Sequence, residues 1–327
     1  MSLPALRAIR LRFPSARIAV QARPWVADLY AREPFCDEII PHTAARGAGD
    51  WPGKLSLVRE IRSRRFDCAI LLQNAFEAAL LAWGAGIPRR IGYNRDGRRL
   101  LLTDAIPVPR KGELPPHESF YYLELLRRAG LIDRLPSPEP IRLEGAPAAR
   151  EIGLDLLSAA GLTHPVIGVS PGAAYGTAKR WLPERFAEAA LEIAGELRGS
   201  VAVFGSRDER PLCQSVADRI SGAGVTAKNL AGATSLREFI AMAAACRLYL
   251  TNDSGAMHIA SALGVPTVAV FGATDPIATG PHGPLARVVR EPVDCAPCLL
   301  RECPIDHRCM TAVPAGLVAR TALELVK

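Results

Sequence analysis

The stretch Asn252–His258 (NDSGAMH) lies between two strongly apolar runs, CRLYLT before it and IASALGVPTVAVFG after it. Buried polar groups cost free energy unless they are paired, so polar residues at this junction need a structural or a chemical reason. The run before the stretch predicts a buried strand, and the residues from Ala256 onward predict a helix. The polar stretch therefore falls where a strand ends and a helix begins.

Junctions of this kind bind ligands in open α/β sheets, because the helix N-terminus presents unpaired N–H groups that attract phosphate. Gly255 permits close approach of a ligand, Ser254 adds a hydroxyl, and His258 follows one turn later on the same helix face. The alternative is that Asp253 or Ser254 only caps the helix. A cap explains one polar residue but not the histidine, so we favour a phosphate site.

A second loop, Pro171–Trp181 (PGAAYGTAKRW), also follows a predicted strand and opens a helix. Its small residues let the backbone wrap a ligand, and Lys179 supplies a cation for a diphosphate. Neither GxxxxGK[ST] nor GxGxxG occurs, which disfavours a P-loop enzyme and a dinucleotide dehydrogenase. At a third strand end, FGSRDER, the acids Asp208 and Glu209 suit ribose hydroxyls, or else they are first-turn acids of a capped helix.

The whole chain alternates apolar strands with helices of about ten to fifteen residues, which predicts parallel sheets covered on both faces. Residues 134–147 (RLPSPEPIRLEGAP) carry four prolines and are typical of a linker. We therefore expect an α/β protein with two doubly wound, Rossmann-like domains that face a cleft, an N-terminal domain over 1–140 and a C-terminal domain over 141–327.

Composition and charge indicate the cellular compartment of the protein and the class of its partners. The sequence has no run of 18 apolar residues and no secretory signal, so we expect it neither to span a bilayer nor to be secreted. Eight cysteines are few for 327 residues, which favours the reducing cytoplasm. Residues 1–150 hold 24 Lys and Arg against 16 Asp and Glu, whereas the remainder hold 16 against 17. The basic half suits an anionic partner, or is a solvated face.

These motifs resemble glycosyltransferase family 9, the bacterial lipopolysaccharide heptosyltransferases. The resemblance rests on PGAAYGTAKRWLPERF, VFGSRDE and NDSGAMHIASALGVPTVAVFGATDP, and in the first half on SLPALRAIRLRFP, LLQNAFEAALLAWGAGIPRRIGY and HESFYYLELL. The late cysteine-rich segment is most similar to the heptosyltransferase II branch. The resemblance implies a GT-B fold and inverting transfer of L-glycero-D-manno-heptose from an ADP-sugar to the lipopolysaccharide inner core, without a metal or other cofactor. A GT-B transferase for another nucleotide-sugar or acceptor, and a donor-binding protein without activity, remain alternatives.

The resemblance also implies a set of donor-binding residues: Thr177, Lys179, Asp208, Asp253, Ser254, Gly255 and His258. Lys179 is expected on the diphosphate and Asp253 on the heptose hydroxyls. Thr177 and backbone N–H groups stand in for threonines that the family has near the phosphate loop. Within the trio Arg207, Asp208 and Glu209, the register of the ribose or adenosine contact is open.

The front of the chain departs from the family pattern. Family members begin with a strand and a Gly-Asp pair, whose acid is the expected general base for the acceptor hydroxyl. Residues 2–10 (SLPALRAIR) match the helix after that pair, so the base is expected upstream of Met1. We therefore expect this polypeptide to be poorly stable and nearly inactive in transfer, even with its donor site intact.

Residues 87–99 (IPRRIGYNRDGRR) concentrate five arginines. The family's acceptor is anionic and lipid-linked, so Arg89, Arg90 and Arg95 are expected to bind it. The same residues could instead contact the cytosolic face of the inner membrane, or form a solvated loop. Nucleic-acid binding is disfavoured, because no stacking aromatic residues are interleaved.

The last motif holds four cysteines within fifteen residues: Cys295, Cys298, Cys303 and Cys309. Zinc takes four sulfur or nitrogen ligands, but only the first two cysteines have the spacing of a ligand pair. Iron–sulfur spacings do not match either. We favour reduced thiols that brace a loop near the ligand site, with structural zinc as the alternative.

Overall fold

The computed structural model describes residues 1–45 and 49–327, and the chain divides into two compact units. Unit 1 is Met1–Ser137 and unit 2 is Pro138–Lys327, so the division falls within the proline-rich stretch. Both units combine parallel strands with helices, which confirms the predicted α/β class. In these described ranges, no helix has the length and apolar character needed to cross a membrane.

Unit 2 contains a six-stranded parallel sheet with the order β11-β10-β9-β6-β7-β8. Its strands are β6 (Val166–Ser170), β7 (Ser200–Val203), β8 (Ala227–Asn229), β9 (Leu248–Asn252), β10 (Thr267–Val270) and β11 (Ala286–Val289). Every residue of β6, β7, β9 and β10 is buried, as expected for central strands covered on both faces. The strand order reverses between β6 and β9, so the loops after these strands meet at the topological switch point where ligands bind.

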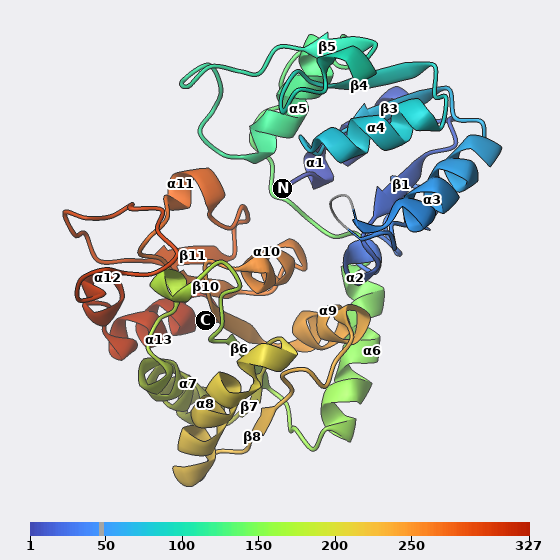
Figure 1. Cartoon of the computed structure of the whole chain (residues 1–327). Helices are drawn as coiled ribbons and strands as arrows, with labels where there is room; N and C mark the ends of the chain where they lie inside the picture. Colours follow the sequence, from blue (N-terminus) through green and yellow to red (C-terminus); the bar gives the residue numbers. More distant parts are fainter. Residues whose placement is uncertain (46–48) are drawn as a thin grey trace. The chain divides into compact units, whose positions relative to one another are not determined.

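Helices cover both faces of this sheet (Figure 1). The helices of unit 2 are α6 (Ala146–Ala159), α7 (Pro183–Leu197), α8 (Arg210–Gly222), α9 (Leu236–Ala245), α10 (Gly255–Ala262), α11 (Pro276–Thr279), α12 (Arg308–Thr311) and α13 (Ala315–Glu324), with 3₁₀ turns η3 (Thr177–Lys179) and η4 (Arg207–Glu209). The apolar sides of α7, α8 and α13 belong to one hydrophobic core with Ile167 and Val169 of β6. On the other face, Phe239 of α9 contacts Tyr249 edge-on. Gly153 lets α6 lie against α9, because a Cβ there would clash with the Ala241 carbonyl.

Unit 1 contains two smaller parallel sheets, β1-β2 and β3-β4-β5. Its strands are β1 (Ala19–Ala22), β2 (Glu38–Pro41), β3 (Cys68–Leu71), β4 (Arg89–Tyr93) and β5 (Asp104–Ile106). Its helices are α1 (Leu3–Arg12), α2 (Pro24–Ala27), α3 (Trp51–Ser63), α4 (Phe76–Gly84) and α5 (Ser119–Arg128), with the 3₁₀ turn η2 (Arg99–Leu101). One core packs Ile9 of α1 and Leu126 of α5 near Ile91, and a second joins Leu57 of α3 to Leu81 of α4.

Unit 1 departs from the prediction in two respects. Its strands form two sheets rather than one doubly wound sheet, because β1 pairs with β2 and β3 pairs with β4, and within the described residues nothing pairs β1 with β3. Residues 25–32 (WVADLYAR) also have the pattern of a helix, but α2 ends at Ala27 and turns follow. No residue of α2 is buried, so this helix lacks the packing that stabilises most helices in proteins.

Candidate functional site

Two loops at the carboxyl edge of the unit 2 sheet are joined by one buried side chain. Asn252 ends β9 and has no exposed surface. Its Nδ2 donates to the carbonyl oxygens of Pro171 at 2.7 Å and Gly172 at 3.4 Å, and its Oδ1 accepts from the backbone N–H of Trp181 at 2.9 Å. Both ends of the loop after β6 are therefore tied to the last residue of β9, and the two predicted ligand loops form one site.

The predicted cation and carboxylate of this site are in direct contact. Lys179, at the end of η3, places its Nζ 2.6 Å from Oδ2 of Asp253. The hydroxyl of Thr274, which follows β10, donates to the same oxygen at 2.6 Å. The side chains of Asp253 and Lys179 are only 5% and 13% exposed, and charges shielded from water interact more strongly. The site thus offers an ammonium that suits a phosphate and a carboxylate that suits sugar hydroxyls.

The first turn of α10 lies beside this ion pair. Ser254 is extended, with φ −150°, and its side chain makes no capping hydrogen bond to the helix. Its hydroxyl lies 3.1 Å from that of Thr251 instead. A Cβ added to Gly255 would meet nothing within 4 Å, and His258 is half-buried one turn further on. The alternative that Ser254 only caps the helix is therefore wrong, because its side chain makes no capping hydrogen bond to α10. The first N–H groups of α10 retain the capacity to bind an anion.

Comparison with known proteins identifies the family of this chain. The family model of glycosyltransferase family 9 (heptosyltransferase) matches residues 54–308. The chain belongs to this family. The resemblance found in the sequence motifs is therefore confirmed, and the chain is a glycosyltransferase.

Several family 9 proteins are similar over most of their length. Lipopolysaccharide heptosyltransferase 2 of Escherichia coli (strain K12) is 33% identical over 295 residues, which are 89% of this chain and 84% of the relative. Lipooligosaccharide heptosyltransferase 2 of Haemophilus influenzae is 30% identical with the same coverage. The solved E. coli ADP-heptose lps heptosyltransferase II aligns with a TM-score of 0.80 and 29% identity, over 99% of this chain and 94% of that one. A family 9 glycosyltransferase from Veillonella parvula aligns with a TM-score of 0.81 and 26% identity, over 99% and 92%. The fold is therefore GT-B, as expected.

Of the acids after β7, Glu209 lies against the loop after β6. A Cβ on Gly172 would clash with the Glu209 carboxylate, so the glycine leaves room for it. Glu209 also closes a capping box, because its Oε2 accepts from the N–H and the hydroxyl of Ser206 at 2.9 and 3.0 Å. Asp208 and Thr177 are exposed. The structure thus shows the capping role at Glu209 and also places this acid next to the loop.

The structure does not bring the three arginines expected at the acceptor to one edge of their sheet. Arg89 and Arg90 open β4, whereas Arg95 follows its end, and a strand of this length separates its two ends by about 13 Å. Arg89 pairs with Asp104 at 3.0 Å, and Arg90 donates to the carbonyl of Leu101 at 2.7 Å. Arg95 is half exposed and lies on the carboxyl side of the sheet, where ligands bind.

The four late cysteines are not gathered as a zinc site requires. Among the residues that the structure describes, no group of three or more His, Cys, Asp or Glu side chains is placed to hold a metal ion. Cys309 is buried next to Gly272, whereas Cys295 is exposed. Burial, with smaller contributions from the other three thiols, raises the pKa of Cys309 to about 11. The side-chain positions therefore give the zinc alternative no support.

Two residues of this site, Asn252 and Thr274, are not among the ligand residues predicted from the sequence. Thr274 follows β10 as Asp253 follows β9, and these strands are neighbours in the sheet. A polar residue after a buried strand is therefore the signal that finds Thr274. The role of Asn252 has no comparable signal, because its partners are backbone groups.

Proposed function

We propose that this chain transfers L-glycero-D-manno-heptose from ADP-heptose to the inner core of lipopolysaccharide. The names of its heptosyltransferase 2 relatives support the reaction. The observation that carries the proposal is the contact of Lys179 with Asp253, at the edge where Asn252 joins two ligand loops. A diphosphate needs a cation and N–H donors, and a heptose needs a carboxylate to accept from its hydroxyls.

The proposed chemistry uses groups that are fixed before the reaction begins. Negative charge develops on the ADP as the sugar leaves it. Lys179 and the first N–H groups of α10 stabilise this charge without reorganisation. Asp253 accepts from the heptose hydroxyls and shares Lys179 with the diphosphate. We assign the ribose contact to Glu209, because its carboxylate lies next to Gly172 in the loop after β6. These roles require no cofactor beyond the donor.

An anionic, lipid-linked acceptor fits the exposed cations of unit 1. Arg95 follows β4, and Arg110 and Lys111 follow β5, so all three come after the carboxyl ends of neighbouring strands. Guanidinium groups bind phosphate and carboxylate with charge-assisted hydrogen bonds. We expect Arg95→Gln to raise KM for the acceptor several-fold and to leave KM for the donor unchanged.

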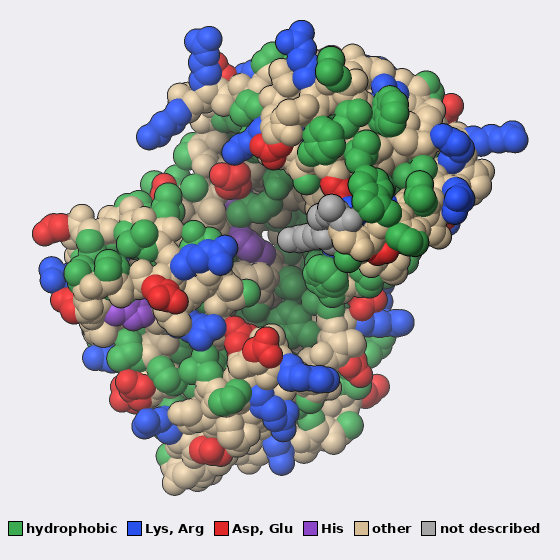
Figure 2. All heavy atoms as spheres, in the orientation of Figure 1, with side chains coloured by type: hydrophobic (Ala, Val, Ile, Leu, Met, Phe, Trp, Pro, Cys, Tyr) green, Lys and Arg blue, Asp and Glu red, His purple; other side chains and the backbone are tan. Residues whose placement is uncertain are grey.

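Peripheral contact with the inner membrane fits another surface of unit 1. Trp51 and Leu55 of α3 and Trp83 of α4 are 54%, 49% and 54% exposed. Figure 2 shows hydrophobic side chains over α3 and α4, with Lys and Arg side chains beside them. Tryptophan favours the membrane interface, and cations favour anionic lipids. We expect the protein to sediment with anionic vesicles and Trp83→Ser to weaken this binding, and equal binding to zwitterionic vesicles would count against it.

Calorimetry with nucleotides tests the proposed function. We expect ADP-heptose to bind more tightly than UDP-sugars, and Lys179→Met to weaken it about 10- to 100-fold, because a hydrogen bond to a charged group contributes about 1.5–3 kcal/mol. Lys228→Met is the matched control, since Lys228 is exposed on the edge strand β8. A preference for UDP-sugars would favour another GT-B transferase. Absence of nucleotide binding would overturn the proposal.

A further inference from the structure

The cysteine-rich segment, residues 295–309, lies directly on the loop after β6. The N–H of Ala178 donates to the carbonyl of Arg301 at 2.9 Å. The ring Nε2 of His307 lies 3.1 Å from the carbonyl of Ala178. A Cβ on Gly176 would clash with the backbone of Arg301, so this approach requires glycine. The cysteine-rich segment and the loop after β6 are therefore held together by backbone hydrogen bonds and close packing.

The same segment is anchored to the loop that carries Thr274. The N–H of Leu299 donates to the carbonyl of Ala273 at 2.8 Å, and the carbonyl of Leu299 accepts from the hydroxyl of Tyr175 at 3.0 Å. Leu299 and His307 both adopt positive φ, at 58° and 57°. Residues with side chains adopt this conformation at a cost in free energy, and such positions cluster at functional sites. The segment is therefore held in a defined conformation between two loops of the donor site.

The ring of Tyr175 brings a second cation to the proposed diphosphate site. Lys179 Nζ lies 4.8 Å from the ring centroid and Arg301 Cζ lies 5.2 Å from it, both within the range of cation–π contacts. Asp253 bonds to Lys179. Arg301 pairs with no carboxylate in the part of the chain that the structure describes. Of the two cations at this ring, only Lys179 contacts a carboxylate within the described residues. The pair therefore carries a net positive charge that can attract an anionic ligand.

We propose that Arg301 is a second cationic ligand for the diphosphate of the donor, held in place by Tyr175 and by residues 295–309. The inference rests on the proposed function and adds a binding residue to its site. A diphosphate carries more than one negative charge, and Asp253 already offsets part of the charge of Lys179. A guanidinium presents a planar set of donors that matches phosphate oxygens. The cysteine-rich segment thereby acquires a function, which is to position Arg301 and the loop after β6.

Equilibrium binding of ADP and adenosine, at low and high salt, tests this role. We expect Arg301→Met to weaken ADP about 10- to 100-fold, to leave adenosine within twofold, and to reduce the salt dependence of ADP binding. Arg301→Lys is expected to recover part of the loss, because it keeps the charge. The matched control is Arg308→Met, since Arg308 lies in the same segment but pairs with Asp306 at 2.9 Å and is half exposed. We expect this control to bind ADP within twofold of the wild type.

The outcomes separate the inference from the proposed function. Equal losses for ADP and adenosine, or equal losses in Arg301→Met and Arg308→Met, would show a purely structural segment and overturn the inference. If Lys179→Met weakens ADP and Arg301→Met does not, the inference fails while the donor site stands. If the wild-type protein binds no ADP, both fail. Tyr175→Phe is expected to retain ADP affinity and Tyr175→Leu to lose part of it, which tests the ring independently of Arg301.

Discussion

The two units differ in where they bury charge. Within the described residues, unit 1 buries four charged side chains and unit 2 buries one. Those of unit 1 are Glu33, Lys54, Arg98 and Glu124. They connect elements to each other, as when Lys54 of α3 pairs with Glu77 of α4 at 3.3 Å. The buried charge of unit 2 is Asp253, which lies in the proposed donor site. Buried charge thus joins elements of the fold in unit 1 and lies in the proposed ligand site in unit 2.

The difference in buried charge between the units follows from how their sheets are built. Unit 2 covers one continuous sheet on both faces, and its central strands are buried along their whole length. In unit 1 the strands form two sheets, and all four residues of β3 are exposed or half-buried. Unit 1 therefore gains less from apolar burial, and its polar contacts contribute a larger share of its stability. Substitutions of buried charge should lower the stability of unit 1 and the ligand affinity of unit 2.

Arg98 is the most deeply buried charge of unit 1. It has no exposed surface, and burial lowers its pKa. Its Nε donates to the carbonyl of Tyr93 at 2.9 Å, one Nη donates to the carbonyl of Gln73, and the other lies 3.4 Å from Oδ1 of Asn74. Gln73 follows β3 and Tyr93 ends β4, so one guanidinium joins the ends of two neighbouring strands.

Replacing this guanidinium should have the largest effect on stability. We expect Arg98→Met to lower the free energy of unfolding of unit 1 by about 2–4 kcal/mol, because it removes the hydrogen bonds of a charged group to the carbonyls of Tyr93 and Gln73, and such bonds contribute about 1.5–3 kcal/mol. Hydrogen exchange of the amides in β3 and β4 measures the change. Arg99→Met is the control, since Arg99 is exposed, and we expect a change within about 0.5 kcal/mol. ADP affinity should be unchanged, and a parallel loss of affinity would break the contrast between the units.

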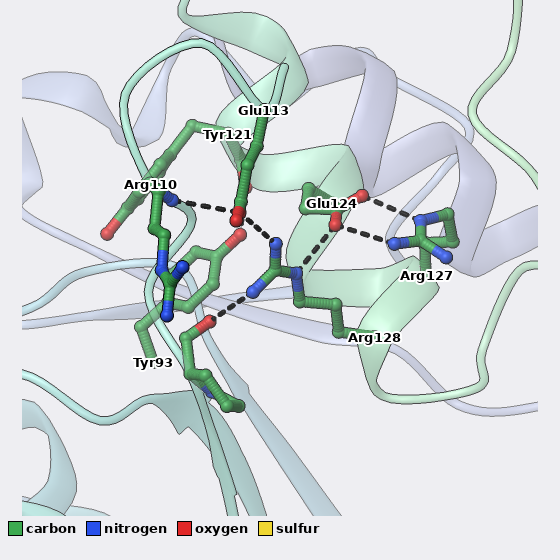
Figure 3. Close-up of polar contacts among 8 residues, drawn as sticks. Tyr93, Arg110, Glu113, Tyr121, Glu124, Arg127 and Arg128 are labelled. Carbon is green, nitrogen blue, oxygen red and sulfur yellow. Dashed lines mark hydrogen bonds and ion pairs between the residues drawn. The ribbon is translucent and has the colours of Figure 1, made fainter.

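Glu124 centres a second network in unit 1, shown in Figure 3. Its carboxylate accepts from Arg127 at 2.7 and 2.8 Å and from Arg128 at 2.6 Å, all within α5. Arg128 also reaches Glu113, at 2.6 Å, and the carbonyl of Pro107, at 3.1 Å. The network therefore fastens the loop after β5 to α5. The guanidinium of Arg127 and then that of Arg128 lower the pKa of Glu124.

The second prediction concerns this carboxylate. We expect Glu124→Gln to lower the free energy of unfolding of unit 1 by about 1.5–3 kcal/mol at pH 7, the usual contribution of hydrogen bonds to a charged group. Because the folded pKa is lowered, the stabilisation is complete above the unfolded pKa of about 4.3 and is lost as the pH falls toward the folded pKa. Urea unfolding between pH 7 and pH 3 should show the two proteins converging at low pH. A constant difference across this range would contradict the assignment, and Glu118→Gln, at the exposed start of α5, is the control.

The unit 2 fold could be predicted from sequence wherever a strand is a continuous apolar run. The runs PVIGVS, SVAVFG, RLYLT and TVAVFG coincide with β6, β7, β9 and β10. The strand β8 reads AKN, is not fully buried and lies at the sheet edge, so no apolar pattern marks it. In unit 1 the division into two sheets depends on strand pairing, which the order of strands and helices along the chain does not encode.

The candidate site, like the fold, could be predicted from the sequence only in part. Lys179 and Asp253 were predictable because polar residues after neighbouring parallel strands meet at one edge. The contribution of Arg301 was not, because the segment that carries it reaches the loop after β6 through backbone hydrogen bonds, and these leave no residue pattern. The arginines after Pro88 are close together in the sequence, but Arg89 opens β4 and Arg95 follows its end, and this separation depends on the strand rather than on the spacing in the sequence.

The smallest effect is expected for Thr274, whose neutral hydroxyl contacts Asp253, the buried charge of unit 2. It tests directly whether polar contacts in unit 2 serve the ligand or the fold. Thr274→Val removes the hydroxyl that donates to Asp253 at 2.6 Å and leaves the contact of Lys179 with the same oxygen in place. A hydrogen bond to a charged group contributes at least about 1.5 kcal/mol, so we expect the dissociation constant for ADP-heptose to rise about tenfold. Thr274→Ser keeps the hydroxyl and should stay within twofold. If both variants lose equal affinity, packing rather than the hydroxyl matters. If Thr274→Val instead lowers the stability of unit 2 and leaves ADP-heptose affinity unchanged, then buried polar groups serve structure in both units.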